Sequence, residues 1–279
     1  MIDKSELIKL LEEIAPPYLS AFWDNDGMQI EPAVRDIGRI LIALDLTSDV
    51  VHEAKLGGYD FVIVHHPMFF GEGANCKKIL QSDATGRLVF RLLVEPPGPI
   101  GVYAAHTSFD AAEDGLCEEL RRRIGLIPWD DRLPPDIAEE FSQIVPYARI
   151  GRFPEPTNLA GAFGRVKTSL GTGVNIRVSG EHGRTVLKVM TVCGGGGDAI
   201  PLAVKTGCSL LITGDIRHHE WRQAEAEGLA LIDAGHYFTE RAFAPLFARR
   251  LEEALGRAYA DIVVDVSTEI RQPYASPVQ

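Results

Sequence analysis

The sequence predicts an α/β protein with mainly parallel sheets flanked by helices, built as two related α/β domains from an internal duplication. Short apolar segments alternate with helical segments in two sets along the chain, and this alternation is typical of βαβ units. The 279 residues are enough for two domains of modest size. We expect the first domain over residues 1–127 and the second over 128–279. Within the second, 128–184 is an irregular connecting portion, and the last strand can return to the first domain.

The first helix is expected to begin after Asp3. Asp3 and Glu6 have the spacing of a capping box, and Pro16-Pro17 ends the segment. Apolar residues at helical spacing form one face, which consists of Leu7, Leu10, Leu11 and Ile14.

The remaining elements follow from apolar runs and helical periodicity. Before the connecting portion we expect strands over 39–44, 61–64 and 100–105, and helices over 49–57, 77–93 and 111–124. After it we expect strands over 186–192, 210–213, 230–232 and 262–266, and helices over 198–206, 218–227 and 239–255. Strands and helices therefore alternate in the same way in both sets.

The two sets can also be aligned with each other, which favours an internal duplication. The matched residues are Asp49 with Asp198, Ala54 with Ala203, Gly58 with Gly207, His106 with His236, and Asp110 with Glu240. Any two βα units can share the first three matches by chance. The paired histidine and acid make a common origin the better interpretation.

Composition and charge disfavour several classes of partner. The 28 basic and 39 acidic side chains give a formal net charge of −11, which opposes binding to nucleic acids or anionic membranes. No apolar run approaches the ~20 residues that span a bilayer, and the N-terminus lacks the apolar core of a signal peptide. The cysteines, which have no CxxC spacing, are expected to be reduced thiols of a cytoplasmic protein. They are Cys76, Cys117, Cys193 and Cys208.

Histidines are concentrated after predicted apolar strands. The residues concerned are His65, His66, His106, His218, His219 and His236. Ligands of an open parallel sheet bind at the carboxyl ends of its strands, so this placement indicates a functional site. Adjacent His65 and His66 are expected to point to opposite faces of an extended chain. They can then serve one metal ion each, or form hydrogen bonds to the backbone.

A histidine followed four residues later by an acid occurs twice, as His106 with Asp110 and as His236 with Glu240. Asp110 can alternatively be the N-cap of the following helix. Glutamate is a poor N-cap, so Glu240 needs another explanation, and metal coordination provides one.

Five residues form the predicted set of metal ligands: His65, His66, Asp110, His236 and Glu240. Imidazoles and carboxylates without thiolates suit Zn, Mn, Fe, Co or Ni. Five protein ligands are too many for one hydrolytic zinc ion that keeps an open position, whereas carboxylates can bridge two ions. We therefore expect two divalent metal ions per chain.

Other residues near these strand ends have candidate roles. His106 and His219 are candidate catalytic acids or bases, because an imidazole titrates near neutral pH. Asp215 is expected to orient a ligand from outside the coordination sphere. The loop Gly194–Gly197 either binds an anion through its amides or makes a tight turn under a close neighbour. Cys193 has no base beside it in the sequence, which disfavours a nucleophilic role.

Five segments in a fixed order carry a resemblance to a known family. They are Trp23-Asp24-Asn25-Asp26-Gly27-Met28-Gln29, His65-His66-Pro67, Ala105-His106-Thr107-Ser108-Phe109-Asp110, Gly214-Asp215 with His219, and Gly235-His236-Tyr237-Phe238-Thr239-Glu240. With these segments the chain resembles the Ngg-interacting factor three-like family, also called GTP cyclohydrolase I type 2. The resemblance covers nearly the whole chain.

The resemblance implies two α/β domains around a dinuclear metal centre, with the same five ligands and Glu240 as the bridge. It also implies a ring-shaped homohexamer whose sites face an internal cavity. We expect a metal-dependent hydrolase acting on a small molecule, with a nucleotide as the leading candidate, in which metal-bound hydroxide opens the purine ring of GTP. A phosphoesterase with the same metals, or a non-catalytic metal-binding or partner-binding ring protein, remains an alternative.

Overall fold

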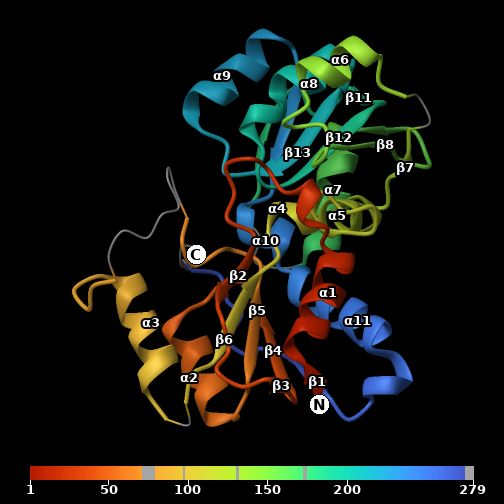
Figure 1. Ribbon diagram of the computed structural model, residues 1–279. Coiled ribbons are helices and arrows are strands. Elements are labelled where there is room, and N and C mark those ends of the chain that lie inside the picture. Colours follow the sequence, from red (N-terminus) through yellow and green to blue (C-terminus); the bar gives the residue numbers. More distant parts are fainter. Residues whose placement is uncertain (71–78, 97, 130–131, 172–174, 274–279) are drawn as a thin grey trace. The chain divides into compact units, whose positions relative to one another are not determined.

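The computed structural model describes residues 1–70, 79–96, 98–129, 132–171 and 175–273. The chain divides into two compact units (Figure 1). Unit 1 comprises residues 1–112 and 243–271, and unit 2 comprises residues 113–242 with the C-terminal residues from 272. Unit 2 begins at residue 113 and not at the expected 128. The last strand belongs to unit 1, a return that the sequence allowed for, and the helix before it belongs to unit 1 as well.

Unit 1 contains a five-stranded sheet with four parallel strands and one antiparallel edge strand. In sheet order these are β15 (Val263–Val266), β4 (Arg39–Ala43), β5 (Phe61–Val64), β6 (Gly101–Ala104) and β2 (Gly27–Ile30). All residues of β5 and β6 are buried, as expected for parallel strands covered by helices on both faces. A separate two-stranded sheet pairs β1 (Ile2–Asp3) with β3 (Asp36–Ile37).

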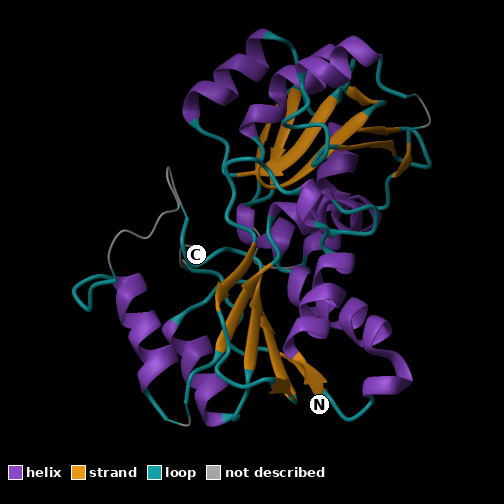
Figure 2. Cartoon of the chain, viewed as in Figure 1, coloured by secondary structure: helices purple, strands orange, loops and turns teal. Residues whose placement is uncertain are grey.

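Helices cover both faces of this sheet (Figure 2). One face carries α2 (Ser48–Leu56) and α3 (Ala84–Val94), and the other carries α1 (Lys4–Ile14) and α11 (Phe243–Leu255). Asp3 is the N-cap of α1 and accepts a hydrogen bond from Ser5 N at 2.9 Å. The helix expected over 77–93 is α3, which begins only at Ala84. The first two residues of the expected range, 77 and 78, lie outside the described residues. The short helices of the unit are η1 (Pro17–Leu19), α4 (Thr107–Ala111) and η3 (Gly256–Tyr259).

Unit 2 contains a six-stranded sheet whose three central strands are parallel to one another. In sheet order the strands are β10 (Arg177–Ser179), β14 (Ala230–Asp233), β13 (Leu210–Gly214), β12 (Val189–Gly195), β8 (Arg149–Arg152) and β7 (Ile127–Pro128). The outer strands pair antiparallel. A small sheet joins β9 (Thr157–Asn158) to β11 (Thr185–Val186). The prediction of α/β domains with mainly parallel central strands is confirmed, while the duplication stays a prediction.

The helices of unit 2 also lie on both sides of its sheet (Figure 2). One side carries α6 (Pro135–Glu140), α8 (Ile200–Lys205) and α9 (His218–Ala226). The other side carries α5 (Leu116–Ile124), α7 (Leu159–Leu170) and α10 (His236–Glu240). The 3₁₀ turn η2 (Gly197–Ala199) leads directly into α8.

Two predicted helices are each divided in the structure. The helix expected over 111–124 is α4 followed by α5, and the helix expected over 239–255 is α10 followed by α11. Helix α4 ends because Ala112 adopts φ −53° and ψ 147°, which is not helical. In both cases the first piece is a five-residue helix that carries one of the predicted carboxylate ligands.

The portion 128–184 is more regular than the sequence suggests. It contains α7, whose buried residues recur at helical spacing: Leu159, Ala162, Val166 and Leu170. Gly161 and Gly164 lower the helical propensity of this segment and obscure the pattern.

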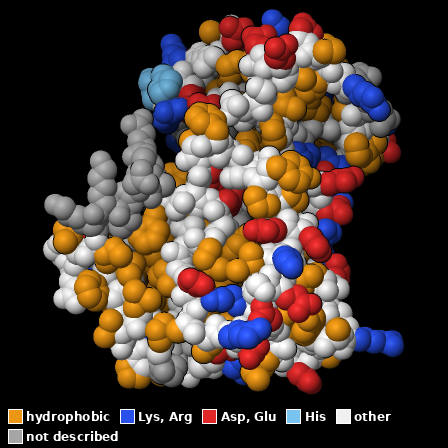
Figure 3. Space-filling view, in the orientation of Figure 1, with side chains coloured by type: hydrophobic (Ala, Val, Ile, Leu, Met, Phe, Trp, Pro, Cys, Tyr) orange, Lys and Arg blue, Asp and Glu red, His pale blue; other side chains and the backbone are white. Residues whose placement is uncertain are grey.

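None of the helices in the described ranges is both long and apolar enough to cross a membrane. On the face of the molecule in Figure 3, acidic and basic side chains are interspersed, and hydrophobic side chains gather on unit 1.

Two glycines of α7 give opposite predictions for stability. Gly164→Ala should raise the free energy of unfolding by about 0.5–1 kcal/mol, because its Cβ would enter open space and alanine favours the helix. Gly161→Ala should lower it, because its Cβ would overlap Thr157 Oγ1. Urea unfolding of both variants tests this, and equal effects of the two substitutions would contradict it.

Candidate functional site

Three predicted histidines come together in unit 1. His65 and His66 follow β5, and His106 follows β6, which is the neighbouring parallel strand. Each offers one ring nitrogen, and these three atoms lie within 4.8 Å of one another. His65 is fully buried, whereas His66 keeps 27% of its side chain exposed. The carboxyl ends of two adjacent strands thus bring together histidines that are 40 residues apart in the sequence.

The rings of His65 and His66 are close together, with their centroids 4.9 Å apart. The expectation that they point to opposite faces is wrong, since β5 ends at Val64 and the chain bends at the two histidines. The alternation of side chains holds only while the backbone stays extended.

The Nδ1 atom of each of these two histidines is held by an oxygen. His65 Nδ1 lies 2.9 Å from Ala105 O, and His66 Nδ1 lies 2.7 Å from Asp45 Oδ1. A carbonyl or carboxylate oxygen can only accept, so Nδ1 carries the proton and Nε2 keeps its lone pair. This tautomer is the one that metal-binding histidines adopt when an outer oxygen orients them.

His106 is held by a buried carboxylate. Its Nδ1 lies 2.9 Å from both oxygens of Asp24, whose side chain is fully buried. Asp24 also accepts from the Thr107 backbone N at 3.1 Å and from the Thr107 hydroxyl. Asp26 accepts from the backbone N of His106 and, at 2.8 Å, from that of Ser108. Two carboxylates of the 23–29 motif therefore fix the start of α4.

These two carboxyl groups have opposite pKa shifts. Burial disfavours the charged form of Asp24, but hydrogen bonding and attraction to His106 outweigh burial and lower its pKa to about 2. Burial raises the pKa of Asp26 above its ordinary value, and the nearby charge of Asp24 reinforces this. Asp24 is therefore the more readily ionised member of the pair.

Asp110 lies inside α4 and is buried. Its Oδ1 is 3.8 Å from His65 Nε2, so the carboxylate faces the nitrogen that keeps its lone pair. The N-cap of α4 is His106, and α5 is capped by Gly115. The alternative that Asp110 is a helix cap is therefore wrong.

In unit 2, His236 and Glu240 share one face of α10. His236 Nε2 lies 2.9 Å from Glu240 Oε2, and the carboxylate is almost fully buried. His236 Nδ1 is 2.8 Å from Asp215 Oδ2, which repeats the pattern of Nδ1 held by an oxygen. Asp215 adopts φ +53°, a left-handed conformation that costs energy in a non-glycine residue. It has the orienting position that the sequence predicts for it.

The glycine loop after β12 makes room for carboxylates. A Cβ on Gly194 would overlap Glu240 Oε1 and lie 3.1 Å from His236 Nε2, and a Cβ on Gly197 would overlap the Glu220 carboxylate. These glycines are therefore explained by close packing against acidic side chains. Of the two alternatives for the loop, the tight turn is favoured over the anion site.

The other predicted residues lie apart from these contacts. His219 is exposed on the first turn of α9. Among the described cysteines, Cys117, Cys193 and Cys208 are buried, as expected for core thiols. Cys193 Sγ lies 3.7 Å from the Thr239 carbonyl oxygen. Cys76 lies outside the described residues.

Sequence reasoning missed the partners of the histidines in unit 1. Asp45 and Asp24 were not selected, although Asp24 and Asp26 stand in the first segment of the resemblance. The signal for these two was a pair of acids next to a glycine in an otherwise apolar region. Nothing in the local sequence marks Asp45, which follows β4, the strand beside β5.

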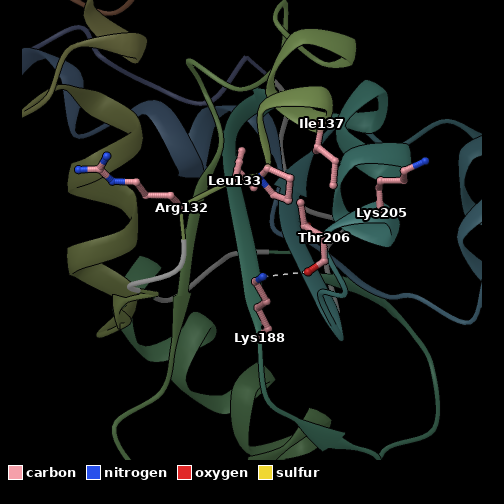
Figure 4. Close-up of a pocket in the computed structure, with 7 residues that line it drawn as sticks. Arg132, Leu133, Ile137, Lys188, Lys205 and Thr206 are labelled. Carbon is pink, nitrogen blue, oxygen red and sulfur yellow. Dashed lines mark hydrogen bonds between the residues drawn. The ribbon is translucent and has the colours of Figure 1, made fainter.

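Unit 2 also has a cavity of about 520 Å³ whose lining contains none of the predicted site residues. Its lining includes Lys188 and Thr206, just before β12 and β13, and Lys188 Nζ donates to Thr206 O at 2.8 Å. Gly194, Gly197 and Asp215 lie at the opposite, carboxyl ends of these strands. Figure 4 shows Arg132 and Lys205 pointing away from Lys188, so the three cations do not converge on one ligand position.

Comparison with known proteins gives one family. The model of Duf34/NIF3 (NGG1p interacting factor 3) matches residues 2–273. A "GTP cyclohydrolase 1 type 2 homolog" from Clostridium perfringens is 30% identical over 272 residues, covering 97% of this chain and 98% of that protein. "Protein NIF3 homolog" from Schizosaccharomyces pombe is 30% identical over 279 residues, covering 96% of each chain. The crystal structure of a Bacillus cereus protein related to NIF3 has a TM-score of 0.83 at 22% identity and covers 99% of each chain, which shows a shared fold.

The buried charge of Asp24 should be visible in the stability of the protein. Because the folded-state pKa lies below the ordinary value of 3.8, ionised Asp24 stabilises the fold above about pH 4, and this is lost as the pH falls toward 2. Asp24→Asn should therefore lower the free energy of unfolding by about 2 kcal/mol at pH 7 and by much less at pH 2.5. Urea unfolding at both pH values measures this.

The matched control for this prediction is Asp261→Asn, a change at an exposed position. It should alter stability by less than about 0.5 kcal/mol. An equal loss at both pH values for Asp24→Asn would show that the charge of Asp24 does not contribute.

Proposed function

Since this chain belongs to the Duf34/NIF3 family, we propose that it is a metal-dependent hydrolase that uses two divalent ions per chain. The proposed ligands are His65, His66, Asp110, His236 and Glu240. Each unit supplies at least one imidazole and one carboxylate: His65, His66 and Asp110 belong to unit 1, and His236 and Glu240 belong to unit 2. Zn, Fe, Mn, Co and Ni all accept this donor set.

One observation carries the proposal. All three ligand histidines have Nδ1 held by an oxygen: His65 by Ala105 O, His66 by Asp45 and His236 by Asp215. Nε2 of His65 and of His66 is therefore a lone-pair donor in a fixed orientation, and Nε2 of His236 faces the Glu240 carboxylate at 2.9 Å. Hydrogen bonds of this kind raise the basicity of the ligand and hold its ring in place.

The residues fit the proposed ions in two further respects. Asp110 and Glu240 are buried carboxylates, and each lies near an Nε2 of this type, at 3.8 Å and 2.9 Å respectively. Gly194 leaves room for the Glu240 carboxylate, which a side chain there would displace. Two bound divalent ions would supply stabilisation of negative charge on oxygen and a water molecule of lowered pKa.

The remaining polar residues have supporting roles in this proposal. Asp45 and Asp215 keep His66 and His236 in the right tautomer. Asp24 orients the ring of His106, and His106 is the residue proposed to move a proton. His219 is the second candidate for proton transfer.

The proposed substrate is a purine nucleotide, because relatives are named GTP cyclohydrolase 1 type 2. Opening the imidazole ring of GTP adds two water molecules and breaks the two bonds from one ring carbon to nitrogen. That carbon leaves as formate, without oxidation or reduction. A phosphoester substrate would release phosphate instead. The ring-shaped hexamer and the exclusion of nucleic acids stay predictions.

Metal content is the first test. Elemental analysis should find about two transition-metal ions per chain in the wild type, and Glu240→Ala should lower this content because it removes a proposed carboxylate ligand. Asp110→Ala, in the other unit, should also lower the content. A wild type that neither contains metal nor takes it up on reconstitution would refute the proposed function.

Two glycine variants give a matched comparison for the same measurement. Gly194→Ala should lower metal content, because its Cβ displaces the Glu240 carboxylate. Gly183→Ala places its Cβ in open space and should leave the content unchanged. Equal metal content in the two variants would show that the close approach of Gly194 to Glu240 does not matter for binding.

Turnover separates the hydrolase from a metal-binding protein without activity. His106→Ala should keep the metal content and lose roughly 10²–10⁴-fold in turnover of GTP, because it removes a proton-transfer group. His219→Ala should show the same pattern if His219 shares this role. Formate release identifies ring opening, and phosphate release identifies a phosphoesterase. Metal-loaded wild type that releases neither would support the non-catalytic alternative.

A further inference from the structure

Two large aromatic side chains of unit 1 are exposed next to His106. Trp23 is 49% exposed and Phe70 is 64% exposed. The ring centroid of Trp23 lies 6.3 Å from that of His106, and the centroid of Phe70 lies 5.8 Å from it. Exposed aromatic rings cost hydration free energy, so a pair of them beside a chemically active residue indicates a binding surface.

The three rings form a corner. Trp23 and Phe70 are 5.9 Å apart with an angle of 89° between their planes, and each is steeply inclined to His106, at 72° and 80°. A flat ligand ring can stack on one aromatic face while its edge meets the other ring. A heteroaromatic ring gains both a stacked and an edge contact from this geometry, whereas an anion without a ring gains neither.

Hydrogen bonds from the side chains of neighbouring residues also hold the corner in place. The carboxylate of Asp24, the neighbour of Trp23, accepts hydrogen bonds from His106 Nδ1 and from the backbone N of Thr107. Asn25 Nδ2 donates to the carbonyl of Phe69, the neighbour of Phe70, at 3.1 Å. The two aromatic segments are therefore tied to each other and to the start of α4. A surface ordered before binding loses less conformational entropy when a ligand arrives.

We propose that Trp23 and Phe70 form the stacking surface for a heteroaromatic ring, of the purine class, and hold it beside His106. This inference deepens the proposed function and rests on it for the choice of a purine. It assigns recognition of the ring to unit 1 and to residues that bind no metal. Stacking accepts any purine, so the surface selects the class of ring and not its substituents.

Equilibrium dialysis with labelled guanosine tests the proposal on the full chain treated with a chelator. Trp23→Ala and Phe70→Ala should each weaken guanosine binding roughly 5- to 150-fold, the range for loss of one stacked ring. Trp23→Tyr should retain most of the affinity. Ribose 5-phosphate and tripolyphosphate, which lack the ring, should not compete. Because no metal or turnover is needed, failure of the hydrolase proposal would leave this result intact.

Phe22→Ala is the matched control, since Phe22 is 84% exposed and adjacent to Trp23 in the chain. It should leave guanosine binding unchanged. A variant that carries Trp129→Phe and Trp221→Phe keeps Trp23 as the single tryptophan, and guanosine should quench its emission. No binding by the wild type, or equal binding by the Trp23→Ala and Phe70→Ala variants, would overturn the proposal. So would a change in oligomeric state on these substitutions, which would identify the corner as an interface between copies.

Discussion

The hydrogen bond between a histidine Nδ1 and an oxygen acceptor is the interaction on which the candidate site depends. It recurs at His65, His66, His106 and His236, each time with a different acceptor. Without it, an imidazole can rotate and exchange tautomers, and its second nitrogen is then a donor for part of the time. With it, one nitrogen is fixed as a base in a known place. The rest of each unit supplies the acceptors at the right distance.

The parallel sheets explain how these acceptors reach their histidines. His66 follows β5, and its partner Asp45 follows the neighbouring strand β4. His236 follows β14, and its partner Asp215 follows β13. In each pair the histidine and the acid lie just beyond the ends of adjacent parallel strands, where side chains must converge. The same topology therefore builds the same pair twice, once in each unit.

The sequence predicts most of this architecture, but not the individual side-chain contacts, the helix breaks or the boundary between the units. Alternating apolar strands and helices identify both sheets, and the placement of histidines after strands identifies the candidate ligands. Asp45 was missed because its contact with His66 depends on which strands are neighbours, and local patterns do not record that. The breaks after α4 and α10 were not predicted. The return of α11 to unit 1 was missed because the boundary was placed from local composition.

The acceptors of the four histidines differ in charge and in burial. Fully buried His65 is paired with a neutral carbonyl, which avoids a second buried charge beside it. His106 is paired with Asp24, a buried carboxylate that stays ionised because several donors support it. His66 and His236 also face carboxylates, but the side chains of Asp45 and Asp215 are 46% and 59% exposed, whereas that of Asp24 is fully buried. His106 therefore differs from the three proposed metal ligands in that a buried carboxylate holds its ring. The fold sets this difference through the partner of Nδ1.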